Sequence, residues 1–402
     1  MNHTLRLLAF VVCASSTVVS AQTATDAKPP AKDIWPEREA TIAVDAKTPR
    51  IRIGIWDSGV DTTLFPSRIA RDKSGKLMVR GYDAFKKRQD TPMEDMPADL
   101  LARQDELNAL TMALDDLDTK VDSPGARDLM KRQLTISAKE RDAIYDDVDR
   151  WGGYIHGSAV ADAALTTHPR AELVIARMEW WHGNPPVPCW SREMANREAD
   201  SIHDLLNFLV ESGARVVNMS WGRYERSYQK NLEQCAKELP LEERNAIARY
   251  SVDTIRAVLR AGMMAAPRVL FVGAAGNEGK TITQSNPATR LDLPNFMLIG
   301  AVDRSGTKAS FSNAGPEVAL YANGWRIPGR LPGGVMAYGT GTSLAAPLVS
   351  NTAAKMLAVN SQLTGADLRR LLQQTADTNS AGLRLMHSAK AVESARASLG
   401  GR

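Results

Sequence analysis

This sequence of 402 residues has no strong excess of charge of either sign. The 50 Lys and Arg residues and the 46 Asp and Glu residues leave a formal charge of +4, and removal of residues 1–21, which hold Arg6 and no acidic residue, lowers it to +3. Nucleic acids and anionic membrane surfaces usually bind strongly basic proteins. We therefore expect neither of them as a partner.

Long hydrophobic runs are also missing beyond the N-terminus. Residues 1–21 combine Arg6, the apolar run 7–13 and the small residues 19–21, a pattern typical of a secretory signal peptide. The run is too short to cross a bilayer, and no later stretch is long and apolar enough. We therefore expect an exported protein, secreted or periplasmic, without a stable membrane anchor.

Cysteine is scarce, with three in the chain. Removal of residues 1–21 would leave Cys189 and Cys235 in an oxidising compartment. Both lie in segments with the character of long loops or insertions, so they could form one disulfide. Two independent thiols are an almost equal alternative at this stage.

The body of the chain alternates strand and helix patterns, with 44% hydrophobic and 24% charged residues, as is usual for a globular protein. Strands are expected at 51–56, 171–177, 215–219, 268–272 and 296–302, and helices at 193–212, 241–261 and from 343 onward. The pattern predicts an α/β domain over 49–396, with a mostly parallel central sheet and helices on both faces. Residues 22–48 favour an extended arm or a linker.

Residues 97–149 interrupt this alternation with a helical insertion. Apolar residues recur every seven positions from Leu100 to Val121, which predicts a helix with one apolar stripe. Residues 123–125 end this helix, and a second one is expected over about 126–148. Such an α-helical hairpin could be a lid that partly covers a cleft, an arm that docks a partner, or a structural buttress, which we consider the safest interpretation.

Four polar residues stand where expected strands end or expected helices begin. Asp57 and Asn277 follow strands, His156 opens a helix of small residues between glycines, and Ser343 opens a helix after a run of Gly and Thr. Each has an ordinary alternative taken alone, such as a turn, a cap or a structural histidine. Together they supply what attack of a hydroxyl on a carbonyl needs, namely a nucleophile, a base, a carboxylate that orients the base and an amide for the oxyanion.

The sequence around these residues resembles the subtilisin-like serine peptidases, or subtilases, from about residue 51 to residue 392. The resemblance rests on five short sequence motifs, which follow one another along the chain in the order typical of that family. They are Asp57-Ser58-Gly59, His156-Gly157-Ser158, Asn218-Met219-Ser220-Trp221-Gly222, Ala274-Ala275-Gly276-Asn277-Glu278-Gly279 and Gly341-Thr342-Ser343-Leu344-Ala345-Ala346-Pro347. It implies a subtilisin-like three-layer fold and a serine endopeptidase acting on polypeptide substrates.

The resemblance also implies a role for each residue. Ser343 would be the nucleophile that forms an acyl-enzyme, His156 the general base and Asp57 the residue that orients His156. Asn277 and the N–H of Ser343 would form the oxyanion hole. The substrate would pair with Ser220, Trp221 and Gly222, and the side chain before the cut would lie against Ala274, Ala275 and Gly276.

Two other functions stay open. The chain could be a binding module that keeps the subtilisin fold without catalysis, or a lipase or esterase of the α/β-hydrolase class. The second is disfavoured because that class places its serine before the acid and the histidine, and because Ala345 stands where its motif has Gly. No cofactor is expected. Calcium sites occur in many subtilases, but we match no acidic loop to one and interpret Asp146, Asp147 and Asp149 as a charge cluster at a helix end.

Overall fold

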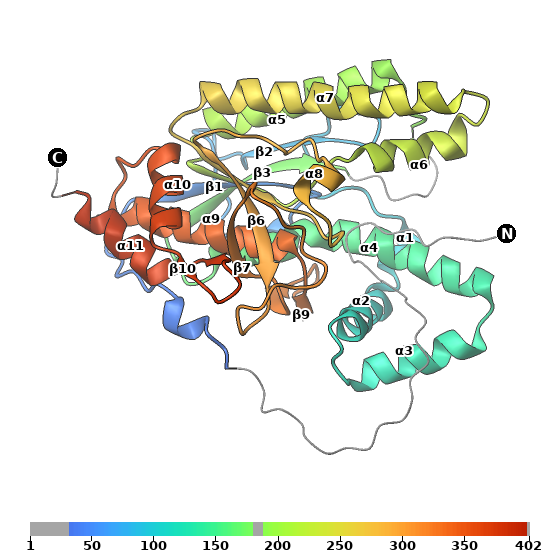
Figure 1. Cartoon of the computed structure of the whole chain (residues 1–402), viewed down its shortest axis with the longest axis horizontal. Coiled ribbons are helices and arrows are strands. Elements are labelled where there is room, and N and C mark those ends of the chain that lie inside the picture. The colour runs from blue at the N-terminus through green and yellow to red at the C-terminus, as the bar shows by residue number, and fades with distance from the viewer. Residues whose placement is uncertain (1–31, 180–187, 400–402) are drawn as a thin grey trace.

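A nine-stranded sheet lies at the centre of the computed structural model, which describes residues 32–179 and 188–399 (Figure 1). The strands of the chain are β1 Ile51–Asp57, β2 Val79–Tyr82, β3 Ala171–Met178, β4 Val216–Met219, β5 Leu270–Ala274, β6 Phe296–Val302, β7 Val318–Asn323, β8 Ile327–Arg330, β9 Met336–Gly339, β10 Asp377–Thr378 and β11 Arg384–Leu385. In the sheet they follow the order β10-β11-β7-β6-β5-β4-β1-β3-β2, parallel throughout except for the β10–β11 pair. Strands β8 and β9 form a separate antiparallel hairpin.

Helices cover both faces of the sheet (Figure 1). They are α1 Ala98–Leu101, α2 Gln104–Asp118, α3 Pro124–Thr135, α4 Ala138–Leu165, α5 Arg192–Glu211, α6 Glu225–Cys235, α7 Leu241–Ala265, α8 Ile282–Ser285, α9 Thr342–Val359, α10 Gly365–Gln374 and α11 Ser388–Ala397, with short 3-10 helices η1 Pro36–Arg38 and η2 Thr62–Leu64. Helices α4, α9, α10 and α11 pack on one face, and α5, α6 and α7 on the other. The predicted three-layer α/β fold is confirmed.

The strand sequences explain why both faces are covered. In β3, Leu173 and Ile175 join the apolar cluster under α4 and α9, whereas Val174 and Ala176 join the cluster under α5 and α7. Successive residues of a strand point to opposite faces, so an uninterrupted apolar run needs a layer on each side.

Helix α4 departs from the prediction at both ends. The expected helix over 126–148 is instead α3 followed by α4, and His156, which was expected to open a helix, lies inside α4. Helix α4 begins after Ser137, whose hydroxyl accepts from the N–H of Glu140 while the Glu140 carboxylate accepts from the N–H of Ser137. The glycines beside His156 therefore mark close packing and not a helix start.

The helical insertion has a core of its own that it shares with the β8–β9 hairpin. Leucines of α2, including Leu107 and Leu114, are buried against Trp151 of α4 and against Leu331 and Ala337 of the hairpin. A buried hydrogen bond of 2.8 Å joins the indole N–H of Trp151 to the side-chain oxygen of Asn108. The insertion is thus a packed part of the domain.

The N-terminal segment lies against the body of the domain where the structure describes it, from residue 32. Ala40 and Ile42 are buried in the cluster under α9, and the indole N–H of Trp35 donates to the carbonyl of Asp303 at 3.1 Å. Glu39 forms an ion pair with Lys355 of α9, whose side chain is fully buried. These contacts are those of a docked arm and not of a free linker.

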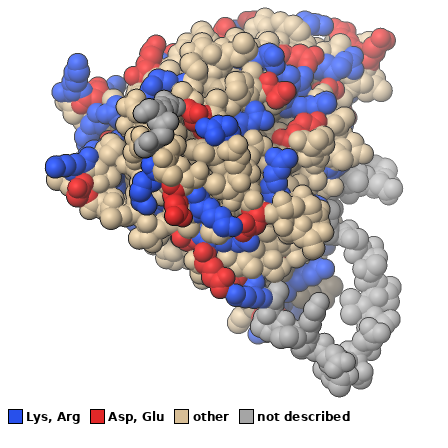
Figure 2. Space-filling view, turned by 60° about the vertical axis from the view of Figure 1, so that its left-hand side comes forward, with Lys and Arg blue, Asp and Glu red and all other residues tan. Residues whose placement is uncertain are grey.

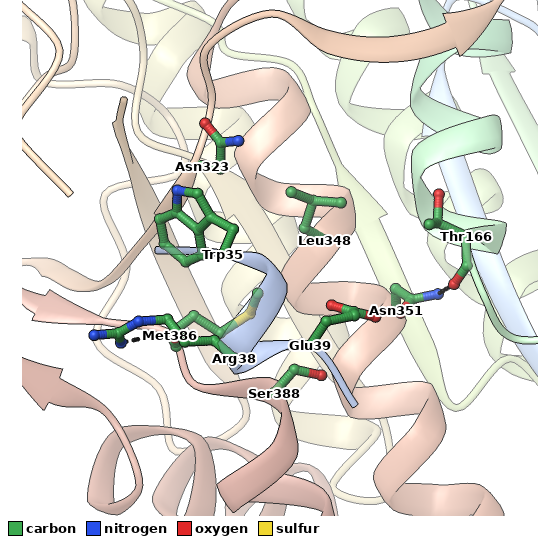
Figure 3. Close-up of a pocket in the computed structure, with 9 residues that line it drawn as sticks. All are labelled: Trp35, Arg38, Glu39, Thr166, Asn323, Leu348, Asn351, Met386 and Ser388. Atoms are coloured by element: carbon green, nitrogen blue, oxygen red, sulfur yellow. Dashed lines mark hydrogen bonds between the residues drawn. The ribbon is translucent and has the colours of Figure 1, made fainter. Parts of the chain in front are cut away.

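Figure 3 shows the small cavity, about 70 Å³, that this segment covers. Trp35 and Glu39 of the segment lie opposite Leu348 and Asn351 of α9. The amide of Asn351 donates to the carbonyl of Thr166 at 2.7 Å, which ties α9 to the end of α4.

The charged side chains are mixed on the surface. In Figure 2, Lys and Arg are interspersed with Asp and Glu over the face shown. This distribution agrees with the small net charge of the whole chain.

Candidate active site

Asp57 and His156 form a buried hydrogen-bonded pair. Asp57 is the last residue of β1 and has no exposed surface, and Oδ1 of its carboxylate lies 2.8 Å from Nδ1 of His156. The same oxygen accepts a hydrogen bond of 2.7 Å from the N–H of Ser58. Because an ionised carboxylate only accepts hydrogen bonds, the proton between the two residues belongs to Nδ1. The imidazole ring is thereby held in the tautomer whose basic nitrogen is Nε2.

Two glycines allow α4 to approach β1 closely enough for this contact. An ideal Cβ on Gly157 would lie 2.0 Å from the carbonyl oxygen of Gly59, so no side chain fits there, and Gly59 has a φ of +134°. Two hydroxyls cross the same junction. Ser58 accepts from the N–H of Gly157 at 3.3 Å, and Ser158 accepts from the N–H of Asp61 at 2.9 Å.

Ser343 lies in the first turn of α9, where a helix offers its N–H no internal acceptor. Four residues later Pro347 has no N–H and cannot donate to the carbonyl of Ser343. The hydroxyl of Ser220, just beyond β4, donates to that carbonyl instead, at 2.6 Å. The backbone of Ser343 is therefore held from outside its own helix.

A chain of buried side chains orients Ser220 in turn. The amide of Asn218 donates to the Ser220 hydroxyl at 2.8 Å, and its oxygen accepts from the hydroxyl of Ser350 at 3.1 Å. All three side chains are buried. No local sequence pattern predicts the role of Ser350, because this role depends on the packing of α9 against β4.

Asn277 faces Ser343 from the loop after β5. Its side-chain oxygen accepts from the N–H of Thr342 at 2.9 Å and from the hydroxyl of Thr342 at 2.8 Å. Since a backbone N–H only donates, this contact identifies the amide oxygen and turns Nδ2 to the other side. An ideal Cβ on Gly341 would lie 3.0 Å from Oγ of Ser343 and 3.2 Å from Nδ2 of Asn277. The hydroxyl and the amide therefore border one space in front of Gly341.

His156 and Ser343 also border a common cavity of about 30 Å³. The structure thus brings Asp57, His156, Asn277 and Ser343 together from four segments that are far apart in the chain. Thr342, for which no role was predicted, sets the direction of the Asn277 amide through the two hydrogen bonds described above.

The side chains of the residues expected to bind substrate point mostly inward. Trp221 is buried and packs edge-on against Trp56, with 5.2 Å between the ring centroids. Ala274 and Ala275 are buried as well, and the hydroxyl of Ser220 is engaged with Ser343. These segments therefore offer mainly backbone groups to a ligand.

A buried charge cluster lies directly behind the segment 220–222. The carboxylate of Glu198 accepts from the Arg223 guanidinium at 3.0 Å and from the Tyr228 hydroxyl at 2.6 Å, and the Lys86 ammonium lies 3.4 Å away. Burial raises the pKa of Glu198, but the charges of Lys86 and Arg223 outweigh it and lower the pKa overall. The cluster anchors the segment 220–222 through Arg223. No local sequence pattern predicts it, because Lys86 comes from a distant loop.

Cys189 and Cys235 are joined by a disulfide, with 5.7 Å between their Cα atoms. This resolves the alternative left open by the sequence. The bond links the segment before α5 to the end of α6, where the side-chain oxygen of Asn231 also accepts from the N–H of Trp190 at 2.8 Å. The disulfide and this hydrogen bond hold α6 beside the charge cluster.

Within residues 32–179 and 188–399, no three His, Cys, Asp or Glu side chains are grouped to hold a metal ion. Asp147, for example, lies 2.5 Å from the Arg103 guanidinium. In the same residues, none of the helices combines the length and the apolar character needed to cross a bilayer.

Comparison with known proteins shows that this chain is similar to one protein family in sequence and to several solved structures in fold. The profile of the subtilase family matches residues 49–389. Subtilisin E of Bacillus subtilis (strain 168) is 38% identical over 108 residues, which are 27% of this chain and 28% of that protein. Subtilisin-like protease 1 of Arthroderma gypseum is 36% identical over 118 residues, which are 29% of this chain and 24% of that protein. The matched region thus spans less than a third of each relative.

Two solved structures match over most of the chain. A structure of subtilase cytotoxin SubAB has a TM-score of 0.54 and 16% identity and covers 89% of this chain and 94% of its own. The PatG macrocyclase in complex with peptide has a TM-score of 0.52 and 18% identity, covering 87% of this chain and 92% of its own. At these identities the likeness concerns the fold alone.

Proposed function

The chain belongs to the subtilase family, and from this premise we propose that it is a serine endopeptidase. The observation that carries the proposal is the hydrogen bond of 2.8 Å between Asp57 and His156, next to a cavity that His156 shares with Ser343. A buried carboxylate that fixes the tautomer of a histidine beside a serine hydroxyl is the arrangement required for nucleophilic attack by that hydroxyl.

The reaction would proceed through an acyl-enzyme on Ser343. Oγ of Ser343 attacks the carbonyl carbon of the peptide bond while its proton passes to Nε2 of His156. The C–N bond then breaks, and the same proton passes from Nε2 to the leaving nitrogen. A water molecule, deprotonated by His156, attacks the ester carbon; the C–Oγ bond breaks, the proton passes from Nε2 back to Oγ of Ser343, and the acyl half leaves as a carboxylic acid. Asp57 keeps Nδ1 protonated and stabilises the imidazolium in each step.

The negative oxygen formed in each attack would be stabilised by two donors. One is Nδ2 of Asn277, which Thr342 directs by holding the amide oxygen. The other is the N–H of Ser343, which helix geometry leaves without an internal acceptor. Because both donors are in place before the substrate binds, little reorganisation is needed in the transition state.

The substrate would be an extended polypeptide, from an unfolded protein or an exposed loop. The segments 220–222 and 274–276 offer mainly backbone groups, because the Trp221 and Ala275 side chains are buried. Backbone pairing of the added-strand type recognises an extended chain with little dependence on its sequence.

We also propose that the protein is exported and that it acts without a bound cofactor. The signal-like pattern of residues 1–21 supports a secreted or periplasmic protein. The Cys189–Cys235 disulfide supports an oxidising compartment.

A fluorophosphonate probe tests the proposal against the alternative of an inactive binding module. We expect the wild-type protein to be labelled and to hydrolyse an unfolded protein substrate. Ser343→Ala should abolish labelling, and Ser343→Ala or His156→Ala should lower turnover by roughly 10⁶-fold, as in subtilisin. A folded wild-type protein that neither reacts with the probe nor cleaves any peptide of a diverse library would contradict the proposal.

A further inference from the structure

The cavity of about 30 Å³ beside His156 and Ser343 lies between the helical insertion and the β8–β9 hairpin. Its lining includes Thr111 of α2, Ile155 and Ala159 of α4, and Leu331, Ala337 and Tyr338 of the hairpin. Apart from the hydroxyls of Thr111 and Tyr338, these side chains are apolar. The cavity is thus a small, mainly apolar space directly next to the proposed reacting centre.

The residues around it place this cavity on the leaving-group side of the scissile bond. Asn277 and the segments 220–222 and 274–276, which would hold the acyl half of the substrate, contribute nothing to its lining. His156, which would protonate the leaving nitrogen, does. The leaving nitrogen belongs to the substrate residue immediately after the scissile bond. The side chain of that residue is the part of the substrate that would enter the cavity.

The wall supplied by the insertion is fixed in place. Thr111 is buried, and its hydroxyl donates to the carbonyl of Leu107 within the same helix at 2.8 Å. At the C-terminal end of α2, Asp116 pairs with Arg326, and the Asp115 carboxylate lies 3.6 Å from the same guanidinium. At its N-terminal end, an ideal Cβ on Gly333 would lie 2.4 Å from the Gln104 amide, so helix and hairpin are in direct contact.

Because α2 is held at both ends and along its buried side, it cannot withdraw at small cost to admit a large side chain. A space of about 30 Å³ holds about two water molecules, at roughly 15 Å³ each. It therefore matches a side chain of no more than one or two heavy atoms.

We propose that α2 of the insertion forms the wall of a specificity subsite that restricts the residue immediately after the scissile bond to Gly, Ala or Ser. The inference rests on the proposed endopeptidase function and adds a substrate class to it, namely polypeptides with a small residue directly after the cut. Forcing a larger group into a packed site carries a penalty equivalent to a loss of roughly 10- to 100-fold in kcat/KM.

The test uses internally quenched peptides that share one acyl half and differ only in the residue after the cut. For the wild-type enzyme we expect kcat/KM to be roughly 10- to 100-fold higher with Ala than with Leu at that position. Thr111→Ala, which enlarges the cavity, should reduce this ratio at least about fivefold. Thr111→Val, which preserves the volume, should keep the ratio, as should Lys131→Ala on the exposed side of the insertion.

A variant that fills the cavity gives the opposite test. Ala337→Val on β9 should shift the preference from Ala towards Gly, and valine suits a strand. Equal cleavage of the Ala and Leu peptides by the wild type, or a preference that neither Thr111→Ala nor Ala337→Val alters, would overturn the inference while the peptidase function stands. If the wild-type protein cleaves none of the peptides and is not labelled by the fluorophosphonate probe, the proposed function is refuted, and this inference with it.

Discussion

The hydroxyl of Ser220 donates a hydrogen bond of 2.6 Å to the backbone carbonyl of Ser343. Pro347 makes this contact necessary, because it removes the N–H that would serve the same carbonyl in a regular helix. Pro347 thus leaves the carbonyl of Ser343 without a donor from the helix, and Ser220 supplies the donor that fixes the start of α9.

We therefore expect Ser220→Ala to act on catalysis more than on folding. Loss of the bond leaves a carbonyl unsatisfied, at a cost of about 1–3 kcal/mol, and allows the first turn of α9 to shift. The expected result is a decrease in kcat of roughly 10- to 100-fold with KM nearly unchanged, measured with a peptide substrate. The matched control is Ser361→Ala at an exposed site. A Ser220→Ala enzyme with wild-type kcat would show that this bond does not position Ser343.

Gly341 keeps open the space that Ser343 and Asn277 share. A methyl group there would lie 3.0 Å from Oγ of Ser343 and 3.2 Å from Nδ2 of Asn277, where the negative oxygen should form. The φ of 162° at Gly341 is an extended conformation that alanine also adopts. We therefore expect Gly341→Ala to fold normally and to lose at least about 100-fold in kcat/KM.

The control for Gly341→Ala is Gly125→Ala in α3, where an added Cβ would lie 3.5 Å from its nearest neighbour, an ordinary contact distance. It should keep wild-type activity and equal or exceed wild-type stability. Circular dichroism checks folding, and peptide hydrolysis checks activity. Full activity in Gly341→Ala would mean that the oxyanion forms elsewhere.

The sequence predicted best those elements whose residues carry their own signal. Strand β6 was expected at 296–302 and occupies Phe296–Val302, because an uninterrupted apolar run in a parallel sheet has few alternatives. Strands β10 and β11 were missed since each has two residues and little apolar character. Such short strands exist only through pairing with a neighbour, which the local sequence does not encode.

Residues of the site could be predicted where they belong to recognisable sequence motifs. Asp57 and His156 were named as partners, but the position of His156 inside α4 was not, since glycine marks both helix ends and close contacts. Only the approach of Gly157 to Gly59 shows which meaning applies. The positioning role of Ser350 depends on tertiary packing, and no local pattern announces it.

Glu39 should stabilise the folded state through Lys355. The ammonium is fully buried and touches Glu39, the carbonyl of Ala40 at 2.9 Å and the hydroxyl of Thr167 at 2.7 Å. Removing the only carboxylate among these contacts leaves a buried charge uncompensated, which usually costs about 3–5 kcal/mol. Because the Glu39 side chain is 41% exposed, we expect Glu39→Gln to lower the free energy of unfolding by less, about 2–3 kcal/mol.

Urea denaturation of the Ser343→Ala protein, which avoids self-cleavage, measures this effect. Glu37→Gln is the control, since Glu37 pairs with Lys32 at 2.7 Å but both side chains are largely exposed. Because water and salt screen such an exposed pair, its loss should leave the free energy of unfolding nearly unchanged. An effect of Glu39→Gln no larger than that of Glu37→Gln would indicate that the pair of Glu39 with Lys355 contributes little to stability.

Asp115 should make the stability of the insertion depend on pH. Burial in α2 raises the pKa of this carboxyl to about 6, and the charge of Asp116 adds to the effect against the opposing influence of Thr340 and Arg326. The folded state therefore prefers the protonated form. Its stabilising contribution is complete below the ordinary value of 3.8 and is lost as the pH rises through about 6.

Asp115→Asn removes this titration, so the difference between variant and wild type reports it, together with the effect of the Asp115 charge on Asp118, whose pKa is raised first by burial and then by that charge. Relative to the wild type, the variant should gain about 2–3 kcal/mol in the free energy of unfolding between pH 4 and pH 7, from 1.36 kcal/mol for each unit of pKa. Denaturation series at several pH values in the Ser343→Ala background measure the gain. Asp128→Asn, at a side chain that is 79% exposed, is the control and should give a difference that does not vary with pH. If Asp115→Asn also gives a constant difference, the carboxyl stays ionised throughout and Arg326 compensates fully for its burial.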